Sequence, residues 1–136
     1  MSKKKVLFVT QELNPFTELS VISDLTRRIT HFATNDEFEF RILMPKFGII
    51  NERRHRLHEV VRLSGMNIIV DDEDYPLIIK VASLPGARLQ VYFLDNEEFF
   101  KRKAVFTDEA EVPFEDNQER LVFFCKGVLE TVKKFG

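Results

Sequence analysis

The chain has 136 residues, of which 44% are hydrophobic and 31% charged, as expected for one globular domain that buries a substantial core. Its formal net charge of −2 gives no overall attraction to nucleic acid or anionic membranes, so we expect neither as a partner. The single cysteine, Cys125, excludes an internal disulfide framework, and its apolar neighbours predict a small core side chain rather than a catalytic thiol.

The first 33 residues have the pattern of a strand, a loop and a helix. Four consecutive apolar residues, 6–9, predict a strand buried on both faces, as in a parallel sheet. This run stops at Thr10, which is too short for a signal peptide or a membrane span, so we expect a cytoplasmic location. A loop at Asn14–Pro15 precedes a helix from about Ser23 to Ala33. The loop of such a unit faces the helix N-terminus, where anions bind.

The predicted helix has apolar residues at helical spacing, which we expect on its buried face: Val21, Ile22, Leu25, Ile29, Phe32 and Ala33.

A second strand is predicted over Phe38–Met44, and a basic patch follows it at residues 51–58. The patch lacks interleaved aromatic residues, so a solvated loop or short helix fits it better than a nucleic-acid site. His55 and His58 stand three residues apart beside Glu59, a spacing seen in metal sites. No further ligand lies at helical spacing, and we expect no metal.

Three short strands, Glu59–Leu63, Met66–Val70 and Leu77–Ala82, are predicted next. The turn residues between them indicate antiparallel hairpins rather than crossover connections. Asp71–Asp74 could suggest a calcium loop, but it lacks the glycine and terminal glutamate of an EF-hand, so an acidic hairpin tip fits better.

The last third of the chain predicts a strand over Gln90–Asn96, an irregular surface loop over 103–115 and a final helix that begins at Asp116. Asp95 and Asn96 lie at the carboxyl end of their strand, on the same edge as Glu12. They could belong to a polar site at that edge or could simply end the strand and cap a helix, and the sequence favours neither. The final helix keeps apolar residues at helical spacing: Leu121, Phe124, Cys125, Val128, Leu129, Val132 and Phe135.

Three stretches resemble the N-terminal part of bacterial glycogen synthases and plant starch synthases. Residues 11–24 resemble S-E-x-x-P-F-x-K-x-G-G-L-x-D, and residues 91–102 resemble V-Y-F-L-D-N-P-E-Y-F-x-R. Residues 116–130 resemble D-N-x-x-R-F-x-x-F-x-x-A-x-L-E, and 45–48 match a Pro-x-aromatic-Gly. The resemblance covers nearly the whole chain in order.

The resemblance implies an α/β fold: a Rossmann-like, partly parallel sheet flanked by helices, with an antiparallel β-hairpin insertion. Residues 1–136 would form a single domain, part of the family's N-terminal Rossmann-like domain. The activity implied is glucosyl transfer from ADP-glucose to an α-1,4-glucan, and no catalytic residue or cofactor is assigned to this chain. The motifs match the family's substrate-binding side chains at five positions: Glu12, Asp24, Asp95, Asn96 and Asn117.

The chain departs from the family where the donor phosphates would lie. Glu18 replaces the motif's lysine, and Ser20–Val21 replace its two glycines. Val21 resists the positive φ that glycine allows. An acid in place of a cation turns attraction to the donor phosphates into repulsion. Each such interaction energy is on the order of 4 kcal/mol at about 4 Å and an effective dielectric near 20. We therefore expect the isolated chain to be inactive.

Two alternatives remain open. The chain could be a non-enzymatic glucan-binding or partner-binding domain, because the family's next strand and second domain do not follow Gly136 in this sequence. Homo-oligomerisation or a partner domain would then cover the face left open. A flavodoxin-like nucleotide domain is the other alternative, and the sequence has no glycine-rich phosphate loop to support it.

Overall fold

The computed structural model describes residues 4–33, 38–87 and 89–135 of the protein. Its elements follow the order β1 (Lys4–Val9), α1 (Val21–Ala33), β2 (Phe38–Pro45), β3 (His58–Glu59), β4 (Met66–Val70), β5 (Glu73–Ser83), β6 (Gln90–Asp95), α2 (Glu97–Phe100) and α3 (Asn117–Phe135).

The strands form one mixed sheet in the order β1-β2-β6-β5-β3, with β4 paired to the free end of β5. β1, β2 and β6 are parallel, whereas β5 runs antiparallel to β6, to β3 and to β4. The α/β fold with a hairpin insertion is therefore confirmed. The tip of the β4–β5 hairpin is acidic, as predicted, with Asp71 and Asp72 both at positive φ (50° and 63°). Two such residues form the turn whose twist matches a two-residue hairpin.

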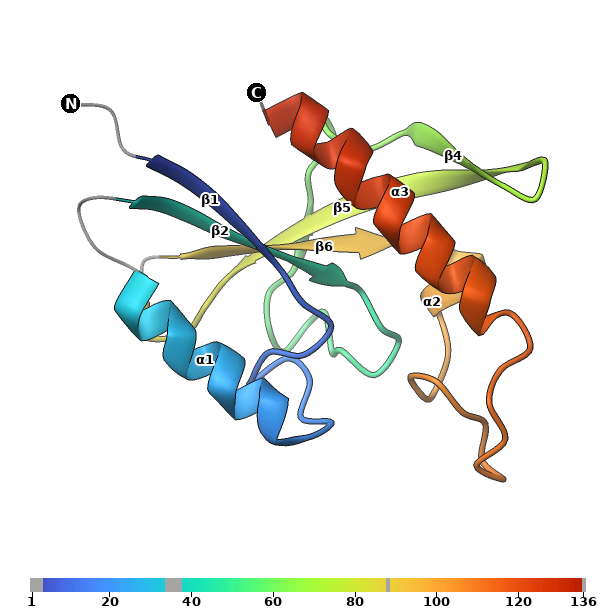
Figure 1. Cartoon of the computed structure of the whole chain (residues 1–136), viewed down its shortest axis with the longest axis horizontal. Helices are drawn as coiled ribbons and strands as arrows, with labels where there is room; N and C mark the ends of the chain where they lie inside the picture. The colour runs from blue at the N-terminus through green and yellow to red at the C-terminus, as the bar shows by residue number, and fades with distance from the viewer. Residues whose placement is uncertain (1–3, 34–37, 88, 136) are drawn as a thin grey trace.

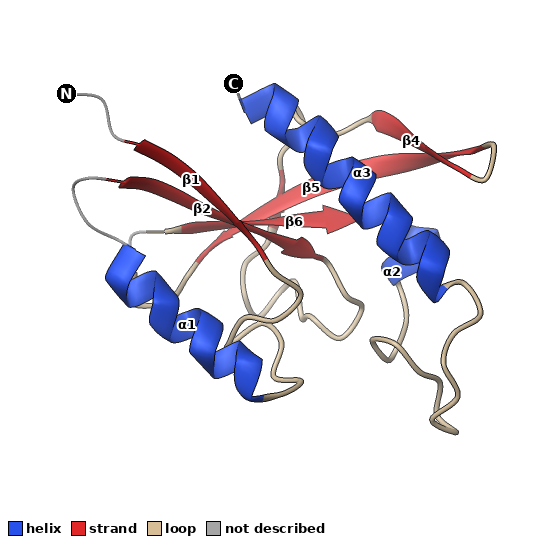
Figure 2. Cartoon of the chain, in the orientation of Figure 1, coloured by secondary structure: helices blue, strands red, loops and turns tan. Residues whose placement is uncertain are grey.

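α1 and α3 lie on the two faces of the sheet (Figures 1 and 2). Successive residues of β6 show this, because side chains alternate along a strand. Phe93 packs edge-on against Phe16 in the loop before α1, with ring centroids 5.1 Å apart. Leu94 points the other way, toward Gly127 of α3. The core fills both sides of the central strands, and Phe93 and Leu94 are both fully buried.

The first strand differs from the prediction. β1 pairs with β2 alone among the described strands, so it lies at the edge of the sheet and not within it. Val6, Leu7 and Phe8 are half-buried, and Val9 is exposed. The apolar run predicts a strand correctly, but the prediction of burial on both faces is wrong because no described strand pairs with its outer edge.

The helix faces also differ from the prediction. α1 turns Ser23, Thr26 and Thr30 into the protein, and these residues are at most 3% exposed. Thr30 donates its hydroxyl proton to the carbonyl oxygen of Arg27 at 2.6 Å, which lets a small polar residue be buried. The expected apolar face is instead exposed in four residues: Val21, Ile22, Leu25 and Ile29. The side chains of Phe32 and Ala33 lie outside the described part.

The final helix follows the prediction in part. Phe123 and Phe124 are buried, and Val128 and Phe135 pack against the core. Cys125 is exposed, so its prediction as a core residue is wrong. The small buried residues Gly127 and Thr131 face the sheet instead, because α3 approaches the sheet closely there. Three further members of the expected face are exposed: Leu121, Leu129 and Val132.

The strand predicted over Glu59–Leu63 is also wrong in extent. β3 has only two residues, and the chain turns at once: the N–H groups of Leu63 and Ser64 both donate to the carbonyl oxygen of Val60 at 3.1 Å. β5, in contrast, is longer than predicted because it pairs with β4 at one end and with β6 at the other.

Candidate functional site at the carboxyl edge of the sheet

The parallel strands β1, β2 and β6 end at the same edge of the sheet, and the segments after them converge there. The N–H of Thr10 donates to the carbonyl oxygen of Leu43 at 3.1 Å, and the N–H of Lys46 donates to that of Leu94 at 2.8 Å. These bonds fix the first residues after β1 and β2 against the neighbouring strand. In α/β sheets ligands bind in the crevice outside this edge.

Glu12 organises the loop between β1 and α1. Its carboxylate accepts hydrogen bonds from the Ser20 hydroxyl at 2.9 and 3.1 Å and from the Ser23 hydroxyl at 3.1 Å. Asp24 accepts a bond from the Asn14 side-chain amide at 2.7 Å. Of the predicted site residues, Glu12 lies in the loop and Asp24 in the first turn of α1, and both tie the loop to the helix.

The Glu18–Val21 turn begins α1. The Ser20 hydroxyl accepts from the N–H of Ile22 at 3.2 Å, which satisfies one of the free amides at the helix N-terminus. Glu18 is exposed, and Val21 is 75% exposed at the first position of the helix. The turn thus presents an acid, a capped amide and a branched side chain to solvent.

Asp95 and Asn96 lie at the carboxyl end of β6, and both are buried. The Asn96 side chain caps α2, because its carbonyl oxygen accepts from the N–H of Phe99 at 3.1 Å. Its amide nitrogen donates to the carbonyl oxygen of Pro76 at 2.9 Å. Asp95 accepts from Lys80 Nζ on the adjacent strand at 2.8 Å. Capping, one of the two roles left open by the sequence, is thus observed for Asn96.

Lys80 links Asp95 to a charged cluster that the sequence reasoning missed. Its Nζ lies 2.7 Å from Glu52, and Glu52 lies 3.6 Å from Lys46, which is almost fully buried. Burial alone would raise the pKa of Glu52, but the hydrogen bond from Lys80 and the charges of both lysines lower it below its ordinary value. Burial would likewise lower the pKa of Lys80, and the bonds to Asp95 and Glu52 raise it instead. Glu52 and Lys80 therefore remain charged at neutral pH.

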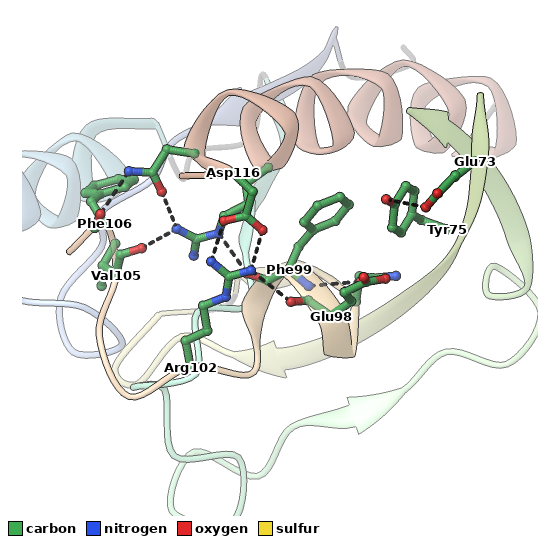
Figure 3. A network of polar contacts seen from close by, with 11 residues as sticks. Glu73, Tyr75, Glu98, Phe99, Arg102, Val105, Phe106 and Asp116 are labelled. Carbon is green, nitrogen blue, oxygen red and sulfur yellow. Dashed lines mark hydrogen bonds and ion pairs between the residues drawn. The ribbon is translucent and has the colours of Figure 1, made fainter. Parts of the chain in front are cut away.

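Asn117 begins α3 and lies beside a buried guanidinium. Its side-chain carbonyl accepts from Arg120 Nη1 at 2.8 Å, and its amide donates to the carbonyl oxygen of Phe106 at 2.8 Å. Arg120 is 3% exposed and also donates to the carbonyl oxygens of Phe99 at 2.7 Å and Val105 at 2.6 Å. Figure 3 shows this network together with the neighbouring Arg102–Asp116 pair.

Arg120 lines a small pocket that opens between the ends of the strands and α3. Nη2 of Arg120 is buried and has no hydrogen-bond partner within the described part of the chain. Burial among aromatic rings, with a smaller contribution from the charge of Arg102, lowers the pKa of Arg120 to about 10, so it stays a cation at neutral pH. Residues from the three segments and the helix line the pocket: Gln11, Pro45, Phe47, Phe100, Phe106, Asn117, Arg120, Leu121 and Phe124.

The edge thus brings together Glu12 after β1, Asp95 and Asn96 at the end of β6, and Asn117 at the start of α3. All of them, and Asp24, hold other parts of the protein in place. Within residues 4–33, 38–87 and 89–135, no three His, Cys, Asp or Glu side chains gather as metal ligands would. In the same ranges, no helix combines the length and apolar character that crossing a bilayer requires.

Comparison with known proteins gives consistent matches over almost the whole chain. The family model described as the starch synthase catalytic domain matches residues 5–136. Glycogen synthases from Chlorobium limicola and Chlorobaculum tepidum are each 41% identical over 133 residues, and one from Chlorobium chlorochromatii is 42% identical over 137. Each match covers 97% of this chain and 27% of the relative, so the chain spans about a quarter of their length.

A solved structure is similar in fold. The catalytic domain of starch synthase IV from Arabidopsis thaliana, bound to ADP and acarbose, superposes with a TM-score of 0.80 at 19% identity. The superposition covers 99% of this chain and 26% of that one.

Proposed function

The chain belongs to the family of starch synthase catalytic domains, and from this membership we propose that it forms the acceptor-side part of a glucosyltransferase fold. The reaction of that fold would be glucosyl transfer from ADP-glucose to an α-1,4-glucan. The observation that supports this most directly is the convergence of polar side chains at one edge of the parallel strands, in the order of the family's motifs. The proposed substrate contacts are Glu12, Asp24, Asp95, Asn96 and Asn117.

We further propose that this chain by itself does not transfer glucose. A diphosphate needs positive charge and closely approaching backbone amides. The α1 turn offers the acid Glu18, and the Ser20 hydroxyl already occupies the N–H of Ile22. The half-charge of a helix N-terminus does not offset a full negative charge placed beside it.

The test is the binding of ADP and the elongation of a glucan by the purified chain. We expect no elongation and no ADP binding below millimolar concentration in calorimetry. The variant Glu18→Lys should bind ADP about fivefold more tightly than the parent, since reversing an exposed charge is worth on the order of 1 kcal/mol. Glu111→Lys is the matched control, because Glu111 is also exposed and lies in a different loop. Micromolar ADP binding at the Glu18–Val21 turn of the unchanged chain would refute the proposal.

A second candidate function, the binding of a partner domain, is supported by exposed apolar surface. Four residues of α1 form an apolar row, and each is at least 45% exposed: Val21, Ile22, Leu25 and Ile29. β1 likewise has an outer edge with which no described strand pairs. Since the relatives are almost four times longer than this chain, we propose that a further part of the synthase fold covers this row. A cytoplasmic location belongs to the same proposal, and an exposed free cysteine suits a reducing compartment.

Light scattering and an apolar dye test this second candidate. A chain with an uncovered apolar face should be monomeric or weakly associating and should bind the dye. Leu25→Glu and Ile29→Glu together should abolish dye binding, whereas Val61→Glu, at a still more exposed apolar site on the loop after β3, should not. A tight dimer would assign the row to a second copy, and a monomer without dye binding would refute any docking role.

A further inference from the structure

The basic segment that follows β2 lines an open groove of about 570 Å³, a size typical of small-molecule sites. Arg54, His55, Arg56 and His58 form one side of it. The rest comes from the loop before α1, the end of β5 and the start of β6: Phe16, Val81, Ala82, Ser83, Pro85 and Gln90. Gln90 and Asp95 are at opposite ends of β6, about 17 Å apart at the rise of a strand. The strand residues of the groove therefore lie away from the carboxyl edge, and Phe16 connects the groove to the loop after β1.

The positive charge of this groove is not neutralised from within. Glu52 is the one acid of the 51–58 segment, and its carboxylate is bonded to Lys80 and Lys46 instead. Glu59 follows His58 in β3, so its side chain points to the opposite face of the strand. No acidic residue lines the groove, and within the described ranges neither Arg54 nor Arg56 has an ion-pair partner.

The segment that bears these side chains is held in place by its backbone. The N–H of Leu57 donates to the carbonyl oxygen of Glu52 at 2.9 Å, and the N–H of Arg54 donates to the Asn51 side chain at 2.9 Å. The His55 ring packs edge-on against Phe16 with centroids 4.9 Å apart. Burial, together with the charge of Arg54, lowers the pKa of His55, so the two arginines provide most of the charge at neutral pH. A preorganised cationic groove loses little entropy when an anion binds.

We propose that this groove binds the phosphoryl group of a small phosphorylated metabolite. Two guanidinium groups on one short turn can each donate two parallel hydrogen bonds to a dianion, the arrangement that favours phosphate. Ser83 and Gln90 in the lining offer neutral donors and acceptors for the hydroxyl groups of an attached sugar. A single-stranded nucleic acid fits less well, because Phe16, the one Phe, Tyr or Trp in the lining, is 4% exposed and cannot stack on a base.

The experiment is a two-dimensional NMR titration of the full chain with inorganic phosphate at constant ionic strength. We expect saturable shifts confined to residues 54–58, Ser83 and Gln90, and an upward shift of the His55 pKa when phosphate is bound. The double variant Arg54→Gln, Arg56→Gln should weaken phosphate binding at least tenfold. Arg53→Gln is the matched control, because Arg53 belongs to the same turn but does not line the groove, and its affinity should stay within twofold of the parent.

The same titration with other phosphorylated compounds identifies the class of ligand. A hexose monophosphate that binds more tightly than inorganic phosphate assigns the groove to a sugar phosphate, and tighter binding of ADP assigns it to a nucleotide. Equal shifts with chloride at the same ionic strength would overturn the proposal. So would a double variant that folds, as judged by its unchanged spectrum elsewhere, and binds phosphate as well as Arg53→Gln does.

Discussion

Arg120 Nε donates to the carbonyl oxygen of Phe99 at 2.7 Å and so joins α3 to α2 across 21 residues of sequence. The same guanidinium donates to the carbonyl oxygen of Val105 and lies near the rings of Phe47, Phe100 and Phe114, at 5.3 to 5.9 Å from their centroids. A buried cation in this position fixes the loop over 101–116, which closes one side of the pocket at the carboxyl edge.

Replacing Arg120 by methionine should lower the free energy of unfolding by about 2–4 kcal/mol. The methionine fills much of the volume but leaves the carbonyl oxygens of Phe99 and Val105 buried without a donor, and each such loss costs about 1–3 kcal/mol. Urea unfolding monitored by circular dichroism measures the difference. Arg62→Met, at an exposed position, is the control and should change stability by less than about 0.5 kcal/mol. A loss below about 1 kcal/mol for Arg120→Met would show that the guanidinium is dispensable.

The Arg102–Asp116 pair should make stability depend on acid pH. The hydrogen bond from Arg102 outweighs burial and lowers the pKa of Asp116 below its ordinary value of 3.8. Its contribution is therefore fully present above about pH 5 and is lost as the pH falls through the lowered pKa. Because the pair is partly exposed, we expect on the order of 1 kcal/mol.

Unfolding free energies at pH 6 and pH 3 test this dependence. Asp116→Asn should be less stable than the parent at pH 6, and the two should converge at the lower pH. Glu130→Gln is the control, because it removes an exposed pair with Lys133. Its unfolding free energy should differ from that of the parent by nearly the same amount at pH 6 and at pH 3. If the difference in unfolding free energy between the parent and Asp116→Asn stays constant with pH, the Arg102–Asp116 pair is not the source of the pH dependence.

Much of the fold could be predicted because several segments have local signals that packing does not override. The run before Pro45 is fully buried in β2, and Asp71–Asp72 form the predicted hairpin tip. The faces of the helices could not be predicted in the same way. Helical periodicity places Leu25 and Ile29 on one side of α1, but it does not say whether the sheet or another surface covers that side.

The candidate site was predictable in its location but not in its contacts. Glu12 follows the end of β1 and Asp95 ends β6, so the sequence places them at one edge of the sheet. Arg120 matches a family motif, but its partners are backbone carbonyls 15 and 21 residues away, which no residue pattern encodes. The Lys80–Asp95 pair depends on the register of two antiparallel strands, and that register appears only in the structure.

Lys80 and Asp95 should show strong coupling in a double-mutant cycle. The pair is mostly buried and lies in a cluster with Glu52. The variants Lys80→Met, Asp95→Asn and the double variant should therefore give an interaction energy of about 1–3 kcal/mol in urea unfolding. The exposed pair Arg41–Glu39 is the control, and its cycle should give less than about 1 kcal/mol. Equal coupling energies in the two cycles would mean that burial adds nothing to the Lys80–Asp95 interaction.

Gly48→Ala should be among the most damaging small substitutions in the chain. A Cβ at this position would lie 2.0 Å from the carbonyl oxygen of Arg102 and 2.8 Å from that of Phe100, both backbone atoms that cannot rotate away. We expect a loss of at least about 3 kcal/mol, measured by urea unfolding. Gly65→Ala is the comparison, since a Cβ there meets no atom within 4 Å. Its only cost is the strain of an alanine at a positive φ of 95°, about 1–2 kcal/mol. Failure of Gly48→Ala to fold would agree with the prediction, whereas a loss no larger than that of Gly65→Ala would show that the 46–50 and 100–102 segments separate freely.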